Sequence, residues 1–90
     1  MNDQAVSPRI AAESARISEA LRHIEYQSTT GAYSAMFSEL AEIRQCLIRL
    51  EVGMFEQAQA VHSWAAIGHW LGVSKQAAFK RYRRSLRLAE

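Results

Sequence analysis

The chain contains a single cysteine, Cys46, among its 90 residues. One thiol can form neither an intramolecular disulfide nor a cysteine metal site, and this fits a reducing, cytoplasmic setting. The N-terminal part lacks a basic segment followed by an apolar core, so we expect no signal peptide. No apolar run approaches the ~20 residues that a membrane-spanning helix needs. The sequence therefore predicts a cytoplasmic protein that has no membrane partner.

Motifs typical of enzymes are also missing. The sequence has no paired catalytic carboxylates, no nucleophile elbow and no glycine-rich phosphate loop. His62 and His69 lie seven residues apart without an acidic or thiol partner, so we expect structural roles for both rather than metal binding. We therefore predict a protein that is not an enzyme and that carries neither a metal nor a cofactor.

Proline occurs once and glycine four times, and the sequence has neither an alternating β-branched run nor an Asn-Gly turn. Hydrophobic residues make up 49% of the chain, which argues against disorder by composition. The pattern predicts an all-α protein, in which a coiled-coil-like N-terminal helical hairpin precedes a C-terminal helix-turn-helix. A chain of this length buries a modest core, so oligomerisation is an expected source of further stability.

Charge is divided unevenly along the chain, although the net formal charge is only +2. Residues 1–60 hold five basic residues against eight acidic ones, whereas residues 61–90 hold six basic residues against one acidic residue. The net charges of the two parts are therefore −3 and +5. This asymmetry predicts that a polyanion binds the C-terminal third of the chain.

We expect three regions: a flexible tail at residues 1–6, a two-helix dimerisation region at residues 7–60 and a helix-turn-helix region at residues 61–90. The first helix is expected to begin at Ser7-Pro8, because serine caps a helix and proline suits its first position. We expect this helix to run to about Tyr26. Its apolar stripe consists of Ile10, Ile17, Leu21 and Ile24.

Turn-forming residues at 27–31 are expected to separate the first two helices, with Thr29 or Thr30 capping the second. Apolar residues of the second helix alternate by three and four, as on the a and d positions of a coiled coil. This seam is longer than the first helix can cover, so we predict that it forms the interface of a homodimer. The seam positions are Tyr33, Met36, Leu40, Ile43, Leu47, Leu50 and Met54. Cys46 flanks the seam and is expected to be buried.

The end of the second helix is expected near Ala60–His62, just before Ser63. Neither proline nor glycine marks this corner, so one kinked helix that continues into the next segment is an alternative. Beyond the corner, Ser63 is expected to cap a short helix, because its hydroxyl can accept a backbone N–H of the first turn. Gly72 suits the left-handed conformation that ends a helix, and Ser74 is expected to cap the last helix.

The segment from Ser63 to Leu86 resembles the helix-turn-helix of bacterial regulators, especially the sigma-factor region-four type and related short regulators. The residues that carry this resemblance are Ser63-Trp64, Ile67-Gly68, Leu71-Gly72-Val73-Ser74, Gln76-Ala77-Ala78 and Tyr82. The chain departs from the pattern at Ala66, where an acidic residue would complete a capping box, and at Lys75, which is usually arginine. The resemblance implies binding to double-stranded DNA, with the second helix of the motif in the major groove.

The last helix has two unlike sides. Its apolar side, expected to pack on the preceding helices, carries Ala78, Tyr82, Ser85, Leu86 and Ala89. The opposite side forms a basic stripe of Gln76, Lys80, Arg83, Arg84 and Arg87. In a major groove, the N-terminal residues of such a helix reach base edges and its later cations meet phosphates. The candidate DNA-binding residues are Ser74, Lys75, Gln76, Phe79, Lys80, Arg83, Arg84 and Arg87.

Three aromatic residues of this region have different expected environments. Trp64 is expected in the core. Trp70 lies off the apolar face of its helix, so either the N-terminal helices shield it or it belongs to a protein interface. Phe79 lies at the edge of the apolar side and is expected either to pack against the second helix or to contact a thymine methyl group.

Two functions fit these patterns. In the first, the chain is a small transcriptional regulator of bacterial, phage or plasmid type, which binds double-stranded DNA sequence-specifically as a homodimer. In the second, the helical hairpin is an interaction module that binds RNA polymerase or a second regulator, and the basic helix adds only non-specific DNA affinity. Discrete binding sites that survive competitor DNA would indicate the first function.

Overall fold

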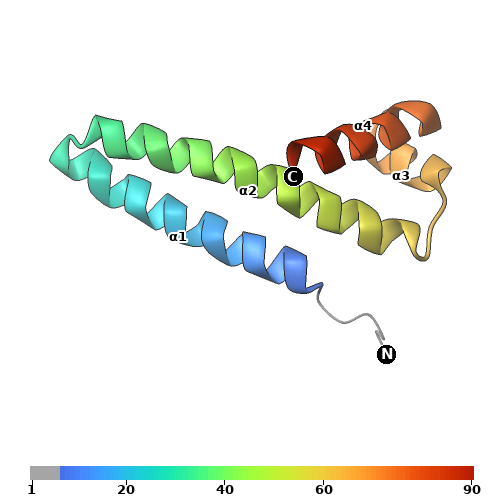
Figure 1. The fold of residues 1–90 in the computed structure, drawn as a ribbon, viewed down its shortest axis with the longest axis horizontal. Helices are drawn as coiled ribbons and strands as arrows, with labels where there is room; N and C mark the ends of the chain where they lie inside the picture. Colours follow the sequence, from blue (N-terminus) through green and yellow to red (C-terminus); the bar gives the residue numbers. More distant parts are fainter. Residues whose placement is uncertain (1–6) are drawn as a thin grey trace. The chain divides into compact units, whose positions relative to one another are not determined.

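A computed structural model describes residues 7–90, which form helices and contain no strand (Figure 1). The predicted all-α class is therefore confirmed, and the order of the helices is compatible with a hairpin followed by a helix-turn-helix. The tail expected at residues 1–6 lies outside the described residues. The helices are α1 (Pro8–Thr30), α2 (Tyr33–Gln59), α3 (Trp64–Leu71) and α4 (Lys75–Leu88).

Helix α1 begins as the sequence predicts and ends later. The Ser7 hydroxyl accepts the backbone N–H of Ile10, and Pro8 occupies the first turn. The predicted end near Tyr26 is wrong, because α1 continues through Thr30. Gly31, at φ +71°, then ends the helix in the left-handed conformation.

The hydroxyl groups near the end of α1 bond within this longer helix. Those of Ser28, Thr29 and Thr30 each donate a hydrogen bond to the carbonyl three residues earlier, at 2.7, 2.7 and 3.1 Å. The threonines therefore belong to the last turn of α1 and do not cap α2 as the sequence predicts. Turn-forming side chains favour local hydrogen bonds, and here these bonds form within the helix.

The chain forms two compact units that divide within α2, between Leu47 and Ile48. The hairpin unit consists of α1 and α2 as far as Leu47, and these two segments run antiparallel on either side of Gly31 (Figure 1). Its buried residues are Glu13, Ala20, Ile43 and Cys46. The predicted burial of Cys46 is confirmed, since this side chain has no exposed surface.

The predicted seam of α2 is only partly buried. Ile43 is buried, and Met36 and Leu50 are half-buried. The other seam residues are exposed, namely Tyr33, Leu40, Leu47 and Met54. Every second seam position thus places an apolar side chain in solvent, and exposed Phe37 lies between the first two of these.

The three-helix unit consists of residues 48–90, which include the end of α2, α3 and α4. Its core is formed by Phe55, Ile67 and Ala78, one from each helix. Trp64 packs against this core as predicted, and its ring centroid lies 5.7 Å from that of Phe55. The end of α2, which we had assigned to the dimerisation region, therefore also supplies core to the C-terminal unit. Because α2 ends at Gln59 and α3 begins at Trp64, the alternative of one kinked helix is wrong.

Candidate nucleic-acid interface

Capping residues define both ends of the turn between α3 and α4. The Ser63 hydroxyl accepts the N–H of Ala66 at 3.1 Å, and the Ser74 hydroxyl accepts the N–H of Ala77 at the same distance. Gly72 ends α3 at φ +74°, a conformation that glycine adopts without strain. All three features lie at the positions that the sequence predicts.

Gly68 allows the turn to lie close to α3. The Val73 N–H donates to the Gly68 carbonyl at 2.9 Å. A Cβ atom at Gly68 would lie 2.8 Å from the Val73 carbonyl oxygen and 3.0 Å from that of Ser74. Both neighbours are backbone atoms, so they cannot move aside as a flexible side chain would. The start of α4 is thereby held against α3.

Polar contacts fasten the inner side of α4 to α2. The Glu51 carboxylate accepts hydrogen bonds from Arg81 Nε at 2.6 Å and from Ser85 Oγ at 2.7 Å. Tyr82 adds a longer hydrogen bond from its hydroxyl to Glu56, at 3.5 Å. Ser85 is buried, so its hydroxyl needs the acceptor that Glu51 provides. These contacts limit how α4 can rotate about its own axis.

The sequence analysis did not identify Glu51 as a partner of α4. It lies 30 and 34 residues before Arg81 and Ser85, and no local pattern links residues at such separations. Glu51 is also four residues after Leu47, on a helix that we expected to serve dimerisation. The one feature of the sequence that could have indicated this contact is the position of Arg81, a cation outside the basic stripe, which suggests an acidic partner within the protein.

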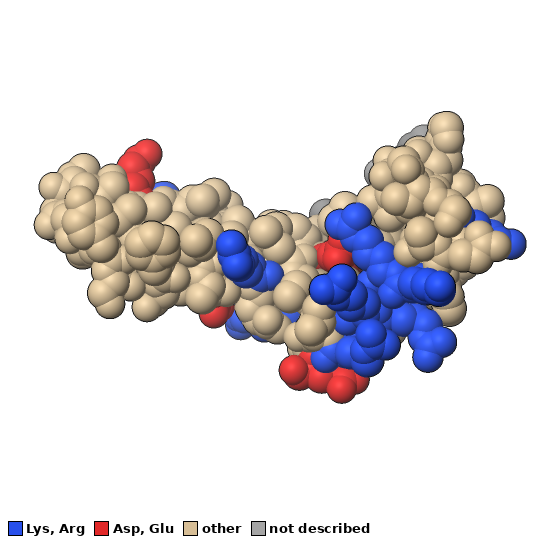
Figure 2. All heavy atoms as spheres, turned by 90° about the horizontal axis from the view of Figure 1, so that it is seen from above, with Lys and Arg blue, Asp and Glu red and all other residues tan. Residues whose placement is uncertain are grey.

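The candidate DNA-binding residues are all exposed, and the buried residues of α4 are Ala78 and Ser85. At ~100° per residue, the basic stripe lies on the side of α4 opposite these two residues. Figure 2 shows lysine and arginine side chains gathered in one area over α4. Arg81 is the exception among the cations of this helix, because its guanidinium pairs with Glu51. The structure thus distinguishes one arginine that is paired with a carboxylate from five other exposed cations: Lys75, Lys80, Arg83, Arg84 and Arg87.

Phe79 lies beside this basic surface and is 41% exposed. Its ring meets Trp64 edge-on, with centroids 5.2 Å apart and an interplanar angle of 84°. A second ring contact joins it to Tyr82 at 6.5 Å. The aromatic contacts of Phe79 thus come from α3 and α4. Part of the ring remains open to solvent on the side of α4.

Trp70 is 60% exposed. Its ring contacts His62 edge-on, with centroids 4.9 Å apart. Both residues belong to the three-helix unit, so this contact lies within that unit.

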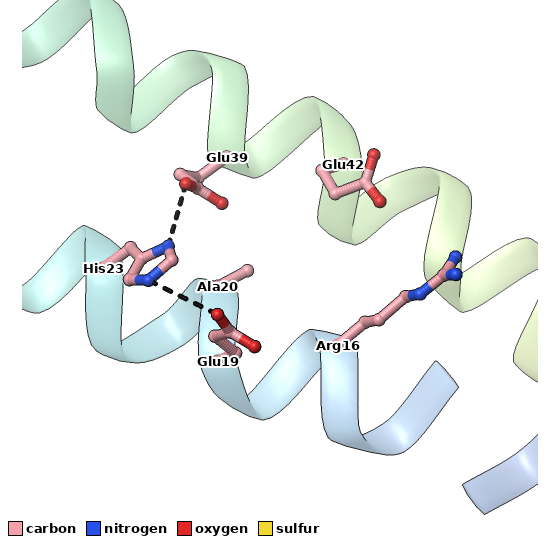
Figure 3. Close-up of a pocket in the computed structure, with 6 residues that line it drawn as sticks. All are labelled: Arg16, Glu19, Ala20, His23, Glu39 and Glu42. Atoms are coloured by element: carbon pink, nitrogen blue, oxygen red, sulfur yellow. Dashed lines mark hydrogen bonds and ion pairs between the residues drawn. The ribbon is translucent and has the colours of Figure 1, made fainter. Parts of the chain in front are cut away.

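A hollow lies in the hairpin unit, between α1 and α2, and the sequence does not predict it. Figure 3 shows His23 between two carboxylates. His23 Nδ1 lies 3.0 Å from Glu39 of α2, and Nε2 lies 3.7 Å from Glu19 of α1. The hollow is open to solvent, and its lining residues are Arg16, Glu19, Ala20, His23, Glu39 and Glu42. The contact with Glu39 joins the two helices of the hairpin, whereas the contact with Glu19 lies within α1.

Comparisons with protein-family models, with curated proteins and with solved structures find no match to this chain. Residues 7–90 also bring together no group of three or more histidine, cysteine or acidic side chains that could hold a metal ion. Within the same residues, no helix combines the length and apolar character that crossing a bilayer requires. The surface of the three-helix unit is therefore the feature from which a function can be inferred.

Proposed function

We propose that the chain is a sequence-specific double-stranded DNA-binding protein that places α4 in the major groove. The observation that carries this proposal is the allocation of charge on α4. All six cations of this helix are exposed, but Arg81 pairs with Glu51, whereas the ion pairs of residues 7–90 include none of the other five. An unneutralised cationic surface on a helix of this kind favours a polyanion as its ligand.

The first turns of α4 are suited to base contacts. Gln76 and Lys80 are exposed on one side, and glutamine pairs with adenine while lysine pairs with guanine in the major groove. The Ser74 hydroxyl already accepts the Ala77 N–H, so its own proton can be donated to a phosphate oxygen. Arg83, Arg84 and Arg87 lie further along the helix, where phosphates are the expected partners.

We further propose that the protein acts as a homodimeric, cytoplasmic regulator of transcription. Helix-turn-helix proteins commonly read two half-sites about 34–36 Å apart, and a dimer supplies two such helices. The exposed apolar side chains of the hairpin unit support self-association, because burying them would remove apolar surface from water. They are Tyr33, Phe37, Leu40 and Leu47.

The same exposed side chains favour a second candidate function, an interaction module for RNA polymerase or another regulator. In that case α4 would bind DNA weakly and without regard to sequence. A gel shift on genomic fragments at increasing salt separates the two candidates. Discrete complexes that survive competitor DNA support the first, and uniform retardation that competitor removes supports the second.

Selection of binding sites from a random duplex library tests the proposal directly. We expect the wild-type protein to return a motif, and Gln76→Ala to lose preference at one or two positions at a cost of about 1–3 kcal/mol on the true site. Glutamine carries no charge, so counterion release cannot produce this effect. Gln59→Ala removes an exposed glutamine at the end of α2 and should leave the motif unchanged. Identical motifs from the wild type and Gln76→Ala would overturn the placement of α4.

A further inference from the structure

Phe79 is the one large apolar side chain among the candidate DNA-binding residues, and 41% of it is exposed. Along α4 it lies four residues after Lys75 and four residues before Arg83, so it shares their side of the helix. An exposed aromatic ring thus lies between two cations on one side of the helix, and the attraction of these cations to phosphates would bring the ring close to a duplex.

The orientation of this ring is held from within the protein. Trp64 meets the ring edge-on at 5.2 Å, and Trp64 itself packs against the buried Phe55 at 5.7 Å. Tyr82 adds the contact at 6.5 Å. A ring with such neighbours loses little conformational freedom on binding, so contact with a ligand costs little entropy. The orientation of the Phe79 ring is therefore set before DNA binds, whereas a flexible lysine or arginine side chain must become ordered on binding.

The chemistry of the major groove offers this surface one matching group. Base edges there present hydrogen-bond donors and acceptors, together with a single apolar group, the C5-methyl of thymine. An apolar ring placed against donors or acceptors would remove them from water without replacing their hydrogen bonds. Placed against the methyl group, the ring removes apolar surface from water and leaves no polar group unpaired.

We infer that Phe79 determines specificity by packing against the C5-methyl group of a thymine, one helical turn along α4 from the bases that Lys75 and Gln76 face. This inference rests on the proposed DNA-binding function. It assigns to Phe79 a preference for thymine that hydrogen-bonding side chains alone would not produce.

Replacement of thymine by deoxyuridine tests the inference without changing the protein. Each thymine of the selected site is replaced in turn, so that only a methyl group is lost. We expect one replacement in each half-site to weaken wild-type binding about fourfold, the factor that corresponds to about 0.8 kcal/mol for one buried methylene-sized group. If every uracil duplex binds as tightly as its thymine counterpart, the inference is wrong.

Protein variants then assign the effect to the ring. Phe79→Ala should bind thymine and uracil duplexes equally, whereas Phe79→Leu, which keeps an apolar side chain, should retain part of the preference. Trp70→Ala removes an aromatic ring that is 60% exposed on α3, and we expect it to keep the full preference. A thymine preference that persists unchanged in a folded Phe79→Ala would overturn the assignment.

Two further duplexes distinguish the sources of the methyl group. At the sensitive position, thymine is replaced by cytosine or by 5-methylcytosine. If the 5-methylcytosine duplex binds more tightly than the cytosine duplex, Phe79 recognises the methyl group on either base. If the two duplexes bind equally, Phe79 recognises the methyl group only on thymine. A wild-type protein that selects no motif would contradict the proposed function. A motif without any uracil effect would contradict only the role of Phe79.

Discussion

The hairpin unit and the three-helix unit place their large apolar side chains differently. In the three-helix unit, Phe55 and Ile67 are buried and the rings of Trp64 and Tyr82 pack against them. In the hairpin unit, the buried residues are small or polar apart from Ile43, several large apolar side chains are half-buried, and six are exposed. These exposed side chains are Leu21, Tyr26, Tyr33, Phe37, Leu40 and Leu47.

The difference follows from helix number. Two helices bury a single strip along their contact, whereas three helices enclose a common interior. The three-helix unit therefore builds an aromatic core and carries exposed cations on α4, which suits the proposed binding of a polyanion. The hairpin unit buries one large apolar side chain and exposes six, which suits the proposed self-association. We propose that the two units divide ligand binding and assembly between them.

The largest expected effect concerns assembly. Leu47→Glu would place an unpaired charge on the exposed apolar surface of α2, and we expect it to weaken a homodimer by about 3 kcal/mol, more than a hundredfold in the dissociation constant. Sedimentation at micromolar concentration measures the change. The wild-type protein should be a dimer and Leu47→Glu a monomer.

Ser38→Glu is the matched control for this change. It introduces the same charge at an exposed position of α2, at ~140° around the helix from Tyr33, and we expect it to leave the dimer intact. A monomeric wild-type protein would contradict this prediction, because the apolar side chains of the hairpin unit would then stay exposed to solvent without driving self-association.

The next effect concerns the close packing of the three-helix unit. Gly68→Ala places a Cβ 2.8 Å from the Val73 carbonyl oxygen, and we expect the free energy of unfolding to fall by about 2 kcal/mol. Gly72→Ala meets no atom within 4 Å but is strained at φ +74°, so about 1 kcal/mol is expected. Urea denaturation of both variants measures the two losses in the free energy of unfolding. A cost at Gly68 no larger than that at Gly72 would show that α3 and the turn can separate without loss.

A smaller effect concerns the polar contacts between α2 and α4. Glu51→Gln removes the charge that Arg81 faces while keeping one acceptor oxygen for Ser85. Because the Arg81 side chain is about half exposed, we expect a loss of only about 1 kcal/mol in the free energy of unfolding. Glu56→Gln, whose contact with Tyr82 is 3.5 Å long, should cost less. Equal losses would show that Glu51 does not fasten α4.

Local signals explain what the sequence predicted. Ser63, Gly72 and Ser74 act through backbone groups within three or four residues, so their roles follow from residue type and order. The predicted break at residues 27–31 began too early, because the hydroxyl groups of residues 28–30, which favour turns, can also donate to carbonyls of their own helix. The contacts of Glu51 with α4 and of Phe79 with Trp64 depend on how helices pack, which periodicity within one helix does not specify.

The smallest expected effect concerns the salt dependence of DNA binding, and it compares two arginines of α4. Arg83→Ala and Arg81→Ala remove the same formal charge from the same helix, so their long-range effects on a polyanion are matched. Arg83 is exposed on the basic stripe, whereas Arg81 is paired with Glu51. We expect Arg83→Ala to reduce the slope of log affinity against log salt by about one ion on a mixed-sequence duplex, and Arg81→Ala to leave this slope unchanged. A phosphate contact does not depend on the base sequence, so the measurement needs no known operator. Fluorescence anisotropy at several salt concentrations measures the slope. Equal reductions would mean that both arginines reach phosphates, and the inward pairing of Arg81 would then not persist on DNA.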